Sequence, residues 1–171
     1  MNYIVYILFH EHKITPTNID IMYCGIFDSE ESAISAIDLL KLSPGFNETP
    51  NCFKIVRFRL DKTHWEEGFS SLIGESTLPE SDEFFDSAQP LKELNLKDVY
   101  LLTHFFDFEL NNGKYHDECR YIGVYSTEEN MLESMKRLSL KDGFKEYKEA
   151  FGDVGVEVNK VEWTCGYFTT D

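Results

Sequence analysis

Residues 23–69 read YCGIFDSEESAISAIDLLKLSPGFNETPNCFKIVRFRLDKTHWEEGF, and residues 121–167 read YIGVYSTEENMLESMKRLSLKDGFKEYKEAFGDVGVEVNKVEWTCGY, with no gap in a register of 98 positions (121 − 23 = 98). Fourteen aligned positions carry the same residue type: Tyr23, Gly25, Glu30, Glu31, Leu40, Leu42, Gly45, Phe46, Glu48, Phe53, Val56, Lys62, Trp65 and Gly68. Identities in one ungapped register that include a Trp, three Gly and a pair of Glu are not expected by chance. The chain therefore contains two copies of one fold.

Each copy predicts two strands before its helix. Residues 2–9 and 19–27 are rich in β-branched and aromatic side chains, and we expect a turn over 10–18 between them. In the second copy, residues 99–110 and 115–125 predict the same hairpin around Asn111-Asn112-Gly113. Gly25 and Gly123 lie inside strands, where we expect a larger side chain to collide with the helix above.

The helix start is the clearest local signal. Residues 28–31 (Asp-Ser-Glu-Glu) and 126–129 (Ser-Thr-Glu-Glu) predict capping boxes, in which Asp28 and Ser126 accept from the first amides. We expect the helices to stop at Gly45 and Gly143 in left-handed conformation. Third strands are predicted over 53–60 and 154–158, and each copy closes with Trp-x-x-Gly-aromatic at 65–69 and 163–167.

These elements predict an α+β fold of two tandem ββαβ repeats. Repeat one spans residues 1–69, an acidic and partly packed connector spans 70–98, and repeat two spans 99–171. A three-stranded sheet with one helix is marginal alone. We therefore expect the repeats to pack into one pseudo-symmetric unit with antiparallel sheet.

The charge is strongly negative. The chain holds 31 Asp and Glu against 16 Lys and Arg, a formal net charge of −15. Such a field repels nucleic acids and anionic membranes and attracts basic proteins. With no signal peptide, no apolar run long enough to span a bilayer and no CxxC spacing, we expect a cytoplasmic protein with four free thiols.

Two acidic clusters are candidate partner-binding sites. The hairpin cluster would steer and pair with a basic partner, and the connector cluster rings two aromatic anchors with charge, as interfaces do. The hairpin cluster consists of Asp107, Glu109, Asp117 and Glu118, and the connector cluster of Glu80, Asp82, Glu83, Phe84, Phe85 and Asp86. The alternative interpretation is the solvated face of a hairpin for the first cluster and a disordered acidic loop for the second.

Catalytic and metal sites have weaker support. His10, Glu11 and His12, with His104 at the matching strand end, lack further ligands at metal-site spacing, so a structural role is favoured. His64 beside Trp65 and two Glu could serve acid–base chemistry, but repeat two keeps only the Trp. No phosphate loop or nucleophile motif occurs. We expect no enzyme activity and no cofactor.

Four motifs of repeat one together resemble a family of small bacterial domains of unknown function. They are the strand Val5 to His10, the corner Tyr23 to Glu31, the turn Pro44 to Phe46, and the closing His64 to Phe69. The resemblance fades in repeat two, where Asp142 replaces Pro44 and Glu162 replaces His64. It implies a fold and carries no activity.

By type alone, a small acidic α+β protein is also similar to bacterial immunity proteins, which neutralise basic toxin domains. The function we expect is non-enzymatic binding of a basic toxin domain, such as a nuclease, by occlusion. The alternative is a small-molecule-binding or regulatory domain that uses the cleft between the repeats.

Overall fold

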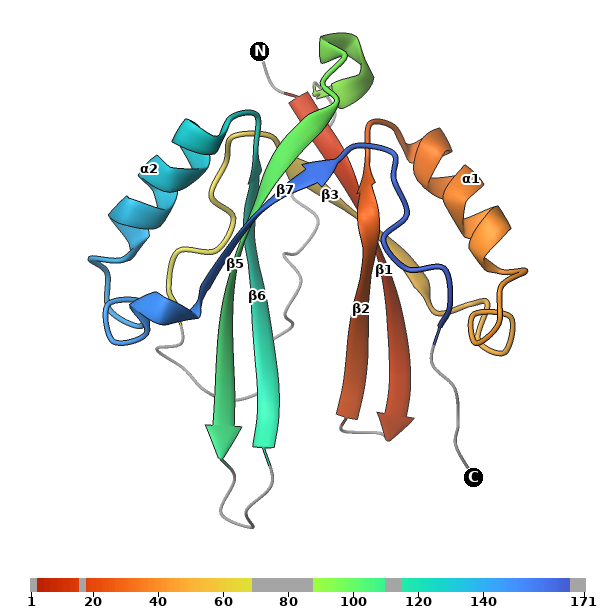
Figure 1. Cartoon of the computed structure of the whole chain (residues 1–171), viewed down its shortest axis with the longest axis horizontal. Coiled ribbons are helices and arrows are strands. Elements are labelled where there is room, and N and C mark those ends of the chain that lie inside the picture. Colours follow the sequence, from red (N-terminus) through yellow and green to blue (C-terminus); the bar gives the residue numbers. More distant parts are fainter. Residues whose placement is uncertain (1–2, 16–17, 69–87, 110–114, 167–171) are drawn as a thin grey trace. The chain divides into compact units, whose positions relative to one another are not determined.

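The computed structural model describes residues 3–15, 18–68, 88–109 and 115–166 (Figure 1). Two sheets and two long helices confirm the α+β class. Repeat one supplies β1 (Tyr3–Thr15), β2 (Asn18–Phe27), α1 (Glu30–Leu40) and β3 (Phe53–Arg59). The connector supplies β4 (Gln89–Pro90) and the 3-10 helix η2 (Leu91–Leu94). Repeat two supplies β5 (Asp98–Glu109), β6 (Tyr115–Tyr125), α2 (Glu128–Leu138), the 3-10 helix η3 (Lys148–Ala150) and β7 (Phe151–Glu157).

The two sheets share one strand order. The first runs β2-β1-β3, with β4 pairing to β1, and the second runs β6-β5-β7. The β1–β2 and β5–β6 pairs are antiparallel. Each has a register shift at the same place, where Cys24 in β2 and Ile122 in β6 are the extra residues opposite Leu8/Phe9 and Leu102/Thr103. β2 and β6 each lie at one edge of their sheet, opposite β3 and β7.

The first hairpin is longer than the sequence predicts. The expected turn over residues 10–18 is wrong, because β1 continues to Thr15 and β2 already begins at Asn18. The polar run after Phe9 is compatible with strand because antiparallel pairing continues from His10↔Met22 to Thr15↔Asn18. The predicted turn at residues 111–113 lies outside the described residues.

Both helix caps lie one residue later than predicted. Ser29 and Thr127 are the N-caps, and their side chains accept from the amides of Ser32 and Asn130. The prediction that Asp28 and Ser126 are the N-caps is therefore wrong by one position. The acids that follow, at 30–31 and 128–129, lie in the first turns, where they suit the positive helix end.

The predicted helix stops are also corrected. α1 ends at Leu40 and α2 at Leu138, each followed by a right-handed C-cap. Gly45 and Gly143 both have φ of 81°, but they lie in the turns beyond the helices. Glycine is needed there for the left-handed turn conformation and not as a helix cap.

The chain forms two compact units that do not follow the repeat boundaries. Unit 1 comprises residues 1–57, 87–97 and 157–171, and unit 2 comprises residues 58–86 and 98–156. Residues 60–68, which we call closing segment one, thus belong to unit 2 with the sheet and helix of repeat two. Residues 158–166, closing segment two, belong to unit 1. In Figure 1, closing segment one (yellow) lies beside α2 and closing segment two (dark blue) beside α1.

Each closing segment covers the free edge of a hairpin. In unit 2 the amides of Asp61 and His64 donate to the carbonyl oxygens of Val124 (2.8 Å) and Ile122 (2.7 Å). In unit 1 the amides of Asn159 and Glu162 donate to the carbonyl oxygens of Ile26 (2.8 Å) and Cys24 (2.9 Å). The four contacts correspond pairwise at the 98-residue offset (61 + 98 = 159, 64 + 98 = 162, 24 + 98 = 122, 26 + 98 = 124). The extra residues of the two register shifts, Cys24 and Ile122, are thus among the acceptors.

The closing segments explain why glycine is needed inside the two strands. A Cβ on Gly25 would lie 2.5 Å from the carbonyl oxygen of Lys160, and one on Gly123 would lie 2.5 Å from that of Lys62. What approaches these glycines is the backbone of a closing segment, not a helix as expected. Gly68 and Gly166 repeat the pattern at the other end, against the backbones of Gly143 and Gly45.

The core of unit 2 shows what the closing segment completes. Buried side chains from β5, β6, α2 and the following turn form one cluster: Leu102, Ile122, Tyr125, Met131, Leu138 and Phe144. Trp65 of closing segment one packs against this cluster. The Arg120 guanidinium, itself buried, lies 4.2 Å from the centre of the Trp65 ring. Trp65, from the Trp-x-x-Gly-aromatic motif of repeat one, therefore covers the core of repeat two.

Replacing Gly123 by Ala is expected to lower the free energy of unfolding by about 1–3 kcal/mol, because the added methyl collides with a backbone that forms part of the edge pairing. Gly155→Ala in β7 is the matched control. Its Cβ would meet nothing nearer than Tyr100, at 3.8 Å, so we expect a change within about 0.5 kcal/mol. Urea unfolding of both variants checks this, and equal effects would contradict the close approach.

Candidate functional site

The acidic hairpin cluster lies at the far end of the β5–β6 pair. The strand register places Asp107 opposite Asp117 and Phe106 opposite Glu118, while Glu109 is opposite Tyr115. In this register Asp107, Glu109 and Asp117 occupy positions on one face of the strand pair, and Glu118 occupies a position on the other face.

The second predicted partner-binding site is the connector cluster. Residues 80 and 82–86, the predicted acids and aromatic anchors, lie outside the described residues. The described end of the connector does pack: Leu91 is fully buried, and the Lys92 amide donates to the carbonyl oxygen of Asp28 in unit 1. The 3-10 helix η2 lies in this described part of the connector.

His64 has a structural role in closing segment one. Its Nε2 accepts the amide of Arg59 at 3.0 Å, its ring lies 4.7 Å from that of Phe58, and its own amide binds Ile122. The lone pair of this Nε2 is thus occupied by the Arg59 amide. The described contacts thus assign this residue to the edge pairing.

His10 and His104 are equivalent buried residues. Nε2 of His10 donates to the carbonyl oxygen of Thr49 (3.1 Å), and Nε2 of His104 donates to that of Tyr147 (2.8 Å). Each ring lies against two phenylalanines: Phe46 and Phe53 in unit 1, and Phe144 and Phe151 in unit 2. Burial lowers the pKa of both histidines, against the opposing effect of the carbonyl hydrogen bond. The described residues contain no group of three ligating side chains suited to a metal ion.

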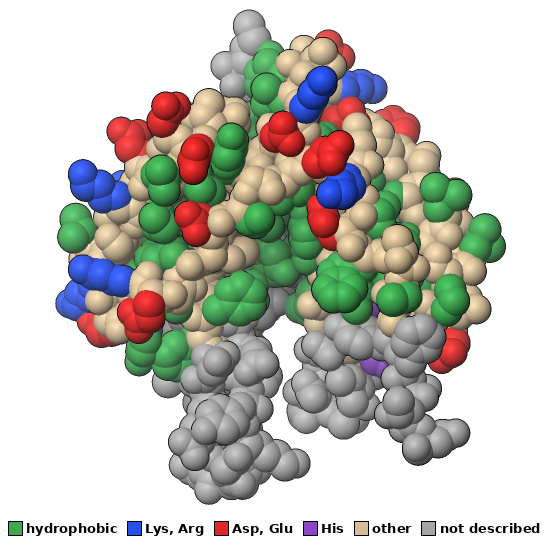
Figure 2. Space-filling model, in the orientation of Figure 1, with side chains coloured by type: hydrophobic (Ala, Val, Ile, Leu, Met, Phe, Trp, Pro, Cys, Tyr) green, Lys and Arg blue, Asp and Glu red, His purple; other side chains and the backbone are tan. Residues whose placement is uncertain are grey.

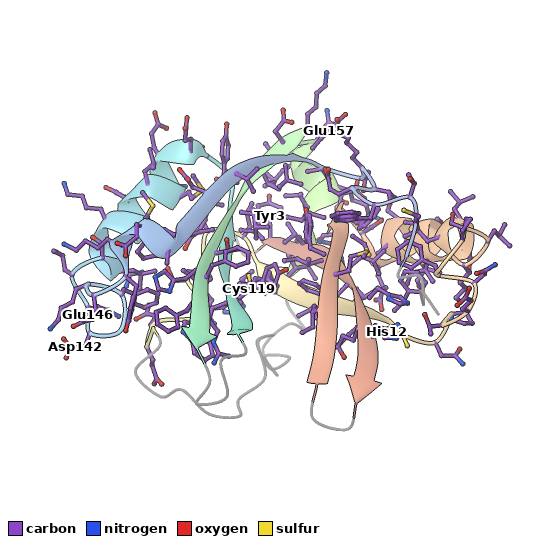
Figure 3. The ribbon with its side chains drawn as sticks, turned by 60° about the horizontal axis from the view of Figure 1, so that its bottom comes forward. Tyr3, His12, Cys119, Asp142, Glu146 and Glu157 are labelled. Atoms are coloured by element: carbon purple, nitrogen blue, oxygen red, sulfur yellow. The ribbon has the colours of Figure 1, made fainter. Side chains whose placement is uncertain are left out.

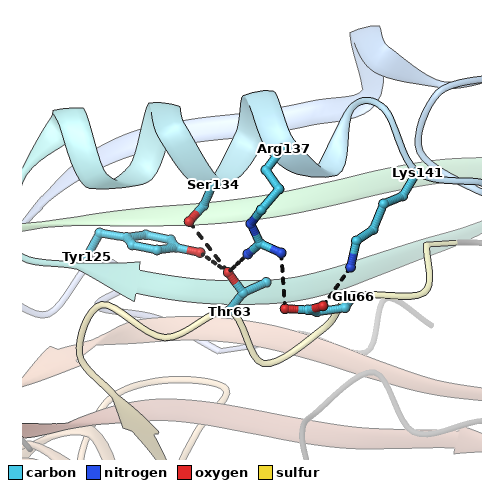
Figure 4. A network of polar contacts seen from close by, with 6 residues as sticks. All are labelled: Thr63, Glu66, Tyr125, Ser134, Arg137 and Lys141. Atoms are coloured by element: carbon cyan, nitrogen blue, oxygen red, sulfur yellow. Dashed lines mark hydrogen bonds and ion pairs between the residues drawn. The ribbon is translucent and has the colours of Figure 1, made fainter.

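The best-developed polar site is the clasp between closing segment one and α2 (Figure 4). The Thr63 hydroxyl receives a hydrogen bond from Arg137 (2.8 Å) and contacts the hydroxyls of Tyr125 (3.1 Å) and Ser134 (3.5 Å). The Glu66 carboxylate accepts from Arg137 (3.2 Å) and Lys141 (2.6 Å). The hydrogen bond from Lys141, together with that from Arg137, holds the pKa of Glu66 below its usual range despite partial desolvation.

A second polar contact closes unit 2 at the start of α2. Asp61, with φ of 59°, accepts from the amide and hydroxyl of Ser126 (2.8 and 2.7 Å) and from the amide of the Asn130 side chain (3.0 Å). A carboxylate at this position also meets the positive end of the helix. Closing segment one therefore carries the anion that the helix terminus attracts.

Unit 1 has the corresponding contact at the start of α1, but there the carboxylate lies before the helix and the closing segment carries the amide side chain. Asn159, with φ of 65°, accepts from the amide of Asp28 (3.1 Å) and donates to the Asp28 carboxylate (2.8 Å). The Asp28 carboxylate also accepts from Ser32 (2.9 Å). Burial alone would raise the pKa of Asp28, but hydrogen bonds led by that from Asn159 outweigh it and lower the pKa.

The sequence contains two signals for the contacts that the closing segments make. Gly25 and Gly123 repeat inside strands, and Asp61 and Asn159 stand at one aligned position, both with side chains that tolerate positive φ. Neither signal says which repeat a segment closes, because either arrangement gives the same sequence pattern.

Comparison with known proteins adds one finding. Residues 3–69 match the model of a domain of unknown function, DUF7336. No curated protein and no solved structure matches the chain. Among the described residues, no helix is long and apolar enough to cross a membrane. The family match covers repeat one only, and its end coincides with the end of closing segment one.

The free energy of unfolding is expected to fall as the pH drops from 7.5 to 5.5. The native pKa values of His10 and His104 lie below the ordinary value of about 6.5, so the unfolded chain binds more protons in this window and protonation favours it. Urea unfolding across the window measures the slope. Asp28 and Glu66 do not contribute to it, since their lowered pKa values act at more acidic pH.

A His10→Gln/His104→Gln variant serves as the control, since glutamine keeps a side-chain N–H but does not titrate. Its slope with pH should be close to flat, whatever its absolute stability. A slope equal to that of the unaltered chain would contradict the assignment of the acid sensitivity to the two buried histidines.

Proposed function

We propose that the chain is a tandem pair of DUF7336-like domains that acts as a non-enzymatic binding protein for a basic protein partner. The tandem interpretation is supported by the 98-residue register, the common element order and the matched edge contacts. The partner class is supported by charge. A net charge of −15 on 171 residues attracts cationic surfaces over a long range at low ionic strength.

Ion pairing on the surface leaves this charge in excess. Basic side chains among the described residues lie within 4.0 Å of a carboxylate, among them Lys41, Lys54, Arg137, Lys141, Lys145 and Lys160. Those contacts occupy cations while acids outnumber bases 31 to 16. In the view of Figure 2 the acidic side chains are scattered rather than gathered in one patch. Figure 3 shows Asp142 and Glu146 on the outer side of the turn after α2, where both pair with Lys145.

The narrower proposal is that of a bacterial immunity protein. Its acidic groups would stand in for the phosphates of a nucleic acid substrate and occlude the active site of a basic toxin domain, such as a nuclease. The hairpin cluster is the docking surface we favour, because the paired strands hold Asp107 opposite Asp117 and concentrate like charge at one end of a sheet. A basic partner would pair its Lys and Arg groups with these acids.

Pull-down against basic proteins encoded beside this gene, together with protection of cells that express them, tests the proposal. Asp107, Glu109, Asp117 and Glu118 are changed together to amides, which moves the net charge from −15 to −11 (−15 + 4). We expect at least a tenfold loss of affinity, since charge pairs at interfaces contribute over 1.4 kcal/mol in sum.

The matched control carries the same charge change on exposed residues elsewhere in unit 2: Asp98, Glu133, Glu149 and Asp153. It should keep most of the affinity. Equal losses in both variants would reduce the interaction to net charge and reject the hairpin as the site. Absence of binding and of protection would reject the immunity function, and a small molecule that co-purifies with the chain would favour the ligand-binding alternative.

A further inference from the structure

The two closing segments differ in chemistry at positions that correspond in the 98-residue register. Thr63 and Glu66 of closing segment one correspond to Val161 and Thr164 of closing segment two (63 + 98 = 161, 66 + 98 = 164). The surfaces that receive them differ in the same sense. The receiving residues Tyr125, Ser134, Arg137 and Lys141 in unit 2 correspond to Phe27, Ala36, Leu39 and Ser43 in unit 1. All six positions of the polar clasp are thus changed together.

Each segment matches the unit in which it lies. Glu66 meets two cations, Arg137 on α2 and Lys141 in the turn that follows it, and Thr63 meets three hydrogen-bonding groups. Against repeat one, the aligned positions would offer Glu66 only Leu39 and Ser43. Charge-assisted hydrogen bonds would be lost there with no replacement.

The start of the helix adds a repulsive element. Each unit has a single carboxylate at this contact: Asp61 beside Ser126 in unit 2, and Asp28 beside Asn159 in unit 1. If closing segment one lay on repeat one, Asp61 would stand where Asn159 stands and would face Asp28. Two carboxylates at hydrogen-bonding distance repel, and one of them must take up a proton. Discrimination by a clash with the wrong partner is a common basis of specificity.

We propose that the two repeats recognise each other as unlike partners, through a code carried by residues 61, 63 and 66 of closing segment one and residues 159, 161 and 164 of closing segment two. The surface of α2 and β6 is a selective binding site for an acidic and polar closing segment. The surface of α1 and β2 selects a neutral and apolar one. Each repeat thus carries the segment that completes the other and not the one that completes itself.

The test is a mutant cycle in the full chain at pH 7. Asn159→Asp places a second carboxylate beside Asp28 and should lower the thermal midpoint by about 4 °C or more. Asn159→Gly removes the same hydrogen bonds without adding charge and tolerates the φ of 65°, so it should be the milder change. Adding Asp28→Ser to Asn159→Asp recreates the Asp–Ser pair of unit 2 and should recover most of the loss.

The pH dependence supplies a second readout that a purely steric effect would not move. The deficit of Asn159→Asp relative to Asn159→Gly should shrink as the pH falls toward 5, since a shared proton relieves the repulsion. Self-closure of each repeat predicts the reverse pattern, because position 159 would then face Ser126 and an Asp there would be harmless. An Asn159→Asp variant no less stable than Asn159→Gly, or no recovery with Asp28→Ser, would overturn the proposal.

Discussion

The backbone of the edge strands β2 and β6 imposes the constraint on which both units depend. The extra residue in each strand, Cys24 or Ile122, presents a carbonyl oxygen away from the neighbouring strand, and the residue two positions later does the same. An uncovered edge of this kind leaves strong acceptors without protein partners and offers a template for aggregation. The closing segments supply the missing donors, and the glycines at 25 and 123 allow their backbones to come close enough.

The same segments also complete the helices and the core. Asp61 and Asn159 bind the residues that lead into α2 and α1, and Trp65 covers the apolar cluster of unit 2. A three-stranded sheet with one helix has little core of its own. Because each closing segment comes from the other repeat, neither repeat contains its full set of stabilising contacts. Duplication is therefore part of what makes the fold stable, and the acidic surface that we propose for partner binding is carried by a scaffold in which both repeats are needed.

The strands and helices could be predicted because their sequence signals are local. The repeat could be predicted because the two copies align without a gap. Period-two alternation, the first-turn acids and the recurring glycines each depend on neighbours within a few residues. The cap was predicted one residue early because Asp28 and Ser29 are both good N-caps. In the structure Ser29 caps the helix, and the Asp28 carboxylate accepts from Asn159 and Ser32 instead. The strand glycines were correctly singled out but assigned to the wrong neighbour. The exchange of segments could not be predicted from the pattern, since aligned repeats leave the choice between self-closure and exchange undetermined. The hairpin acids were predicted as a group; in the strand register Asp107, Glu109 and Asp117 take positions on one face of the pair, and Glu118 takes a position on the other.

The exchange is tested most directly by nuclear Overhauser contacts between backbone protons in the full chain. The account predicts cross-peaks that link the amide of His64 to the backbone around Ile122, and the amide of Glu162 to the backbone around Cys24. Cross-peaks from His64 to the region of Cys24, and from Glu162 to the region of Ile122, would show that each repeat closes itself and would contradict the account.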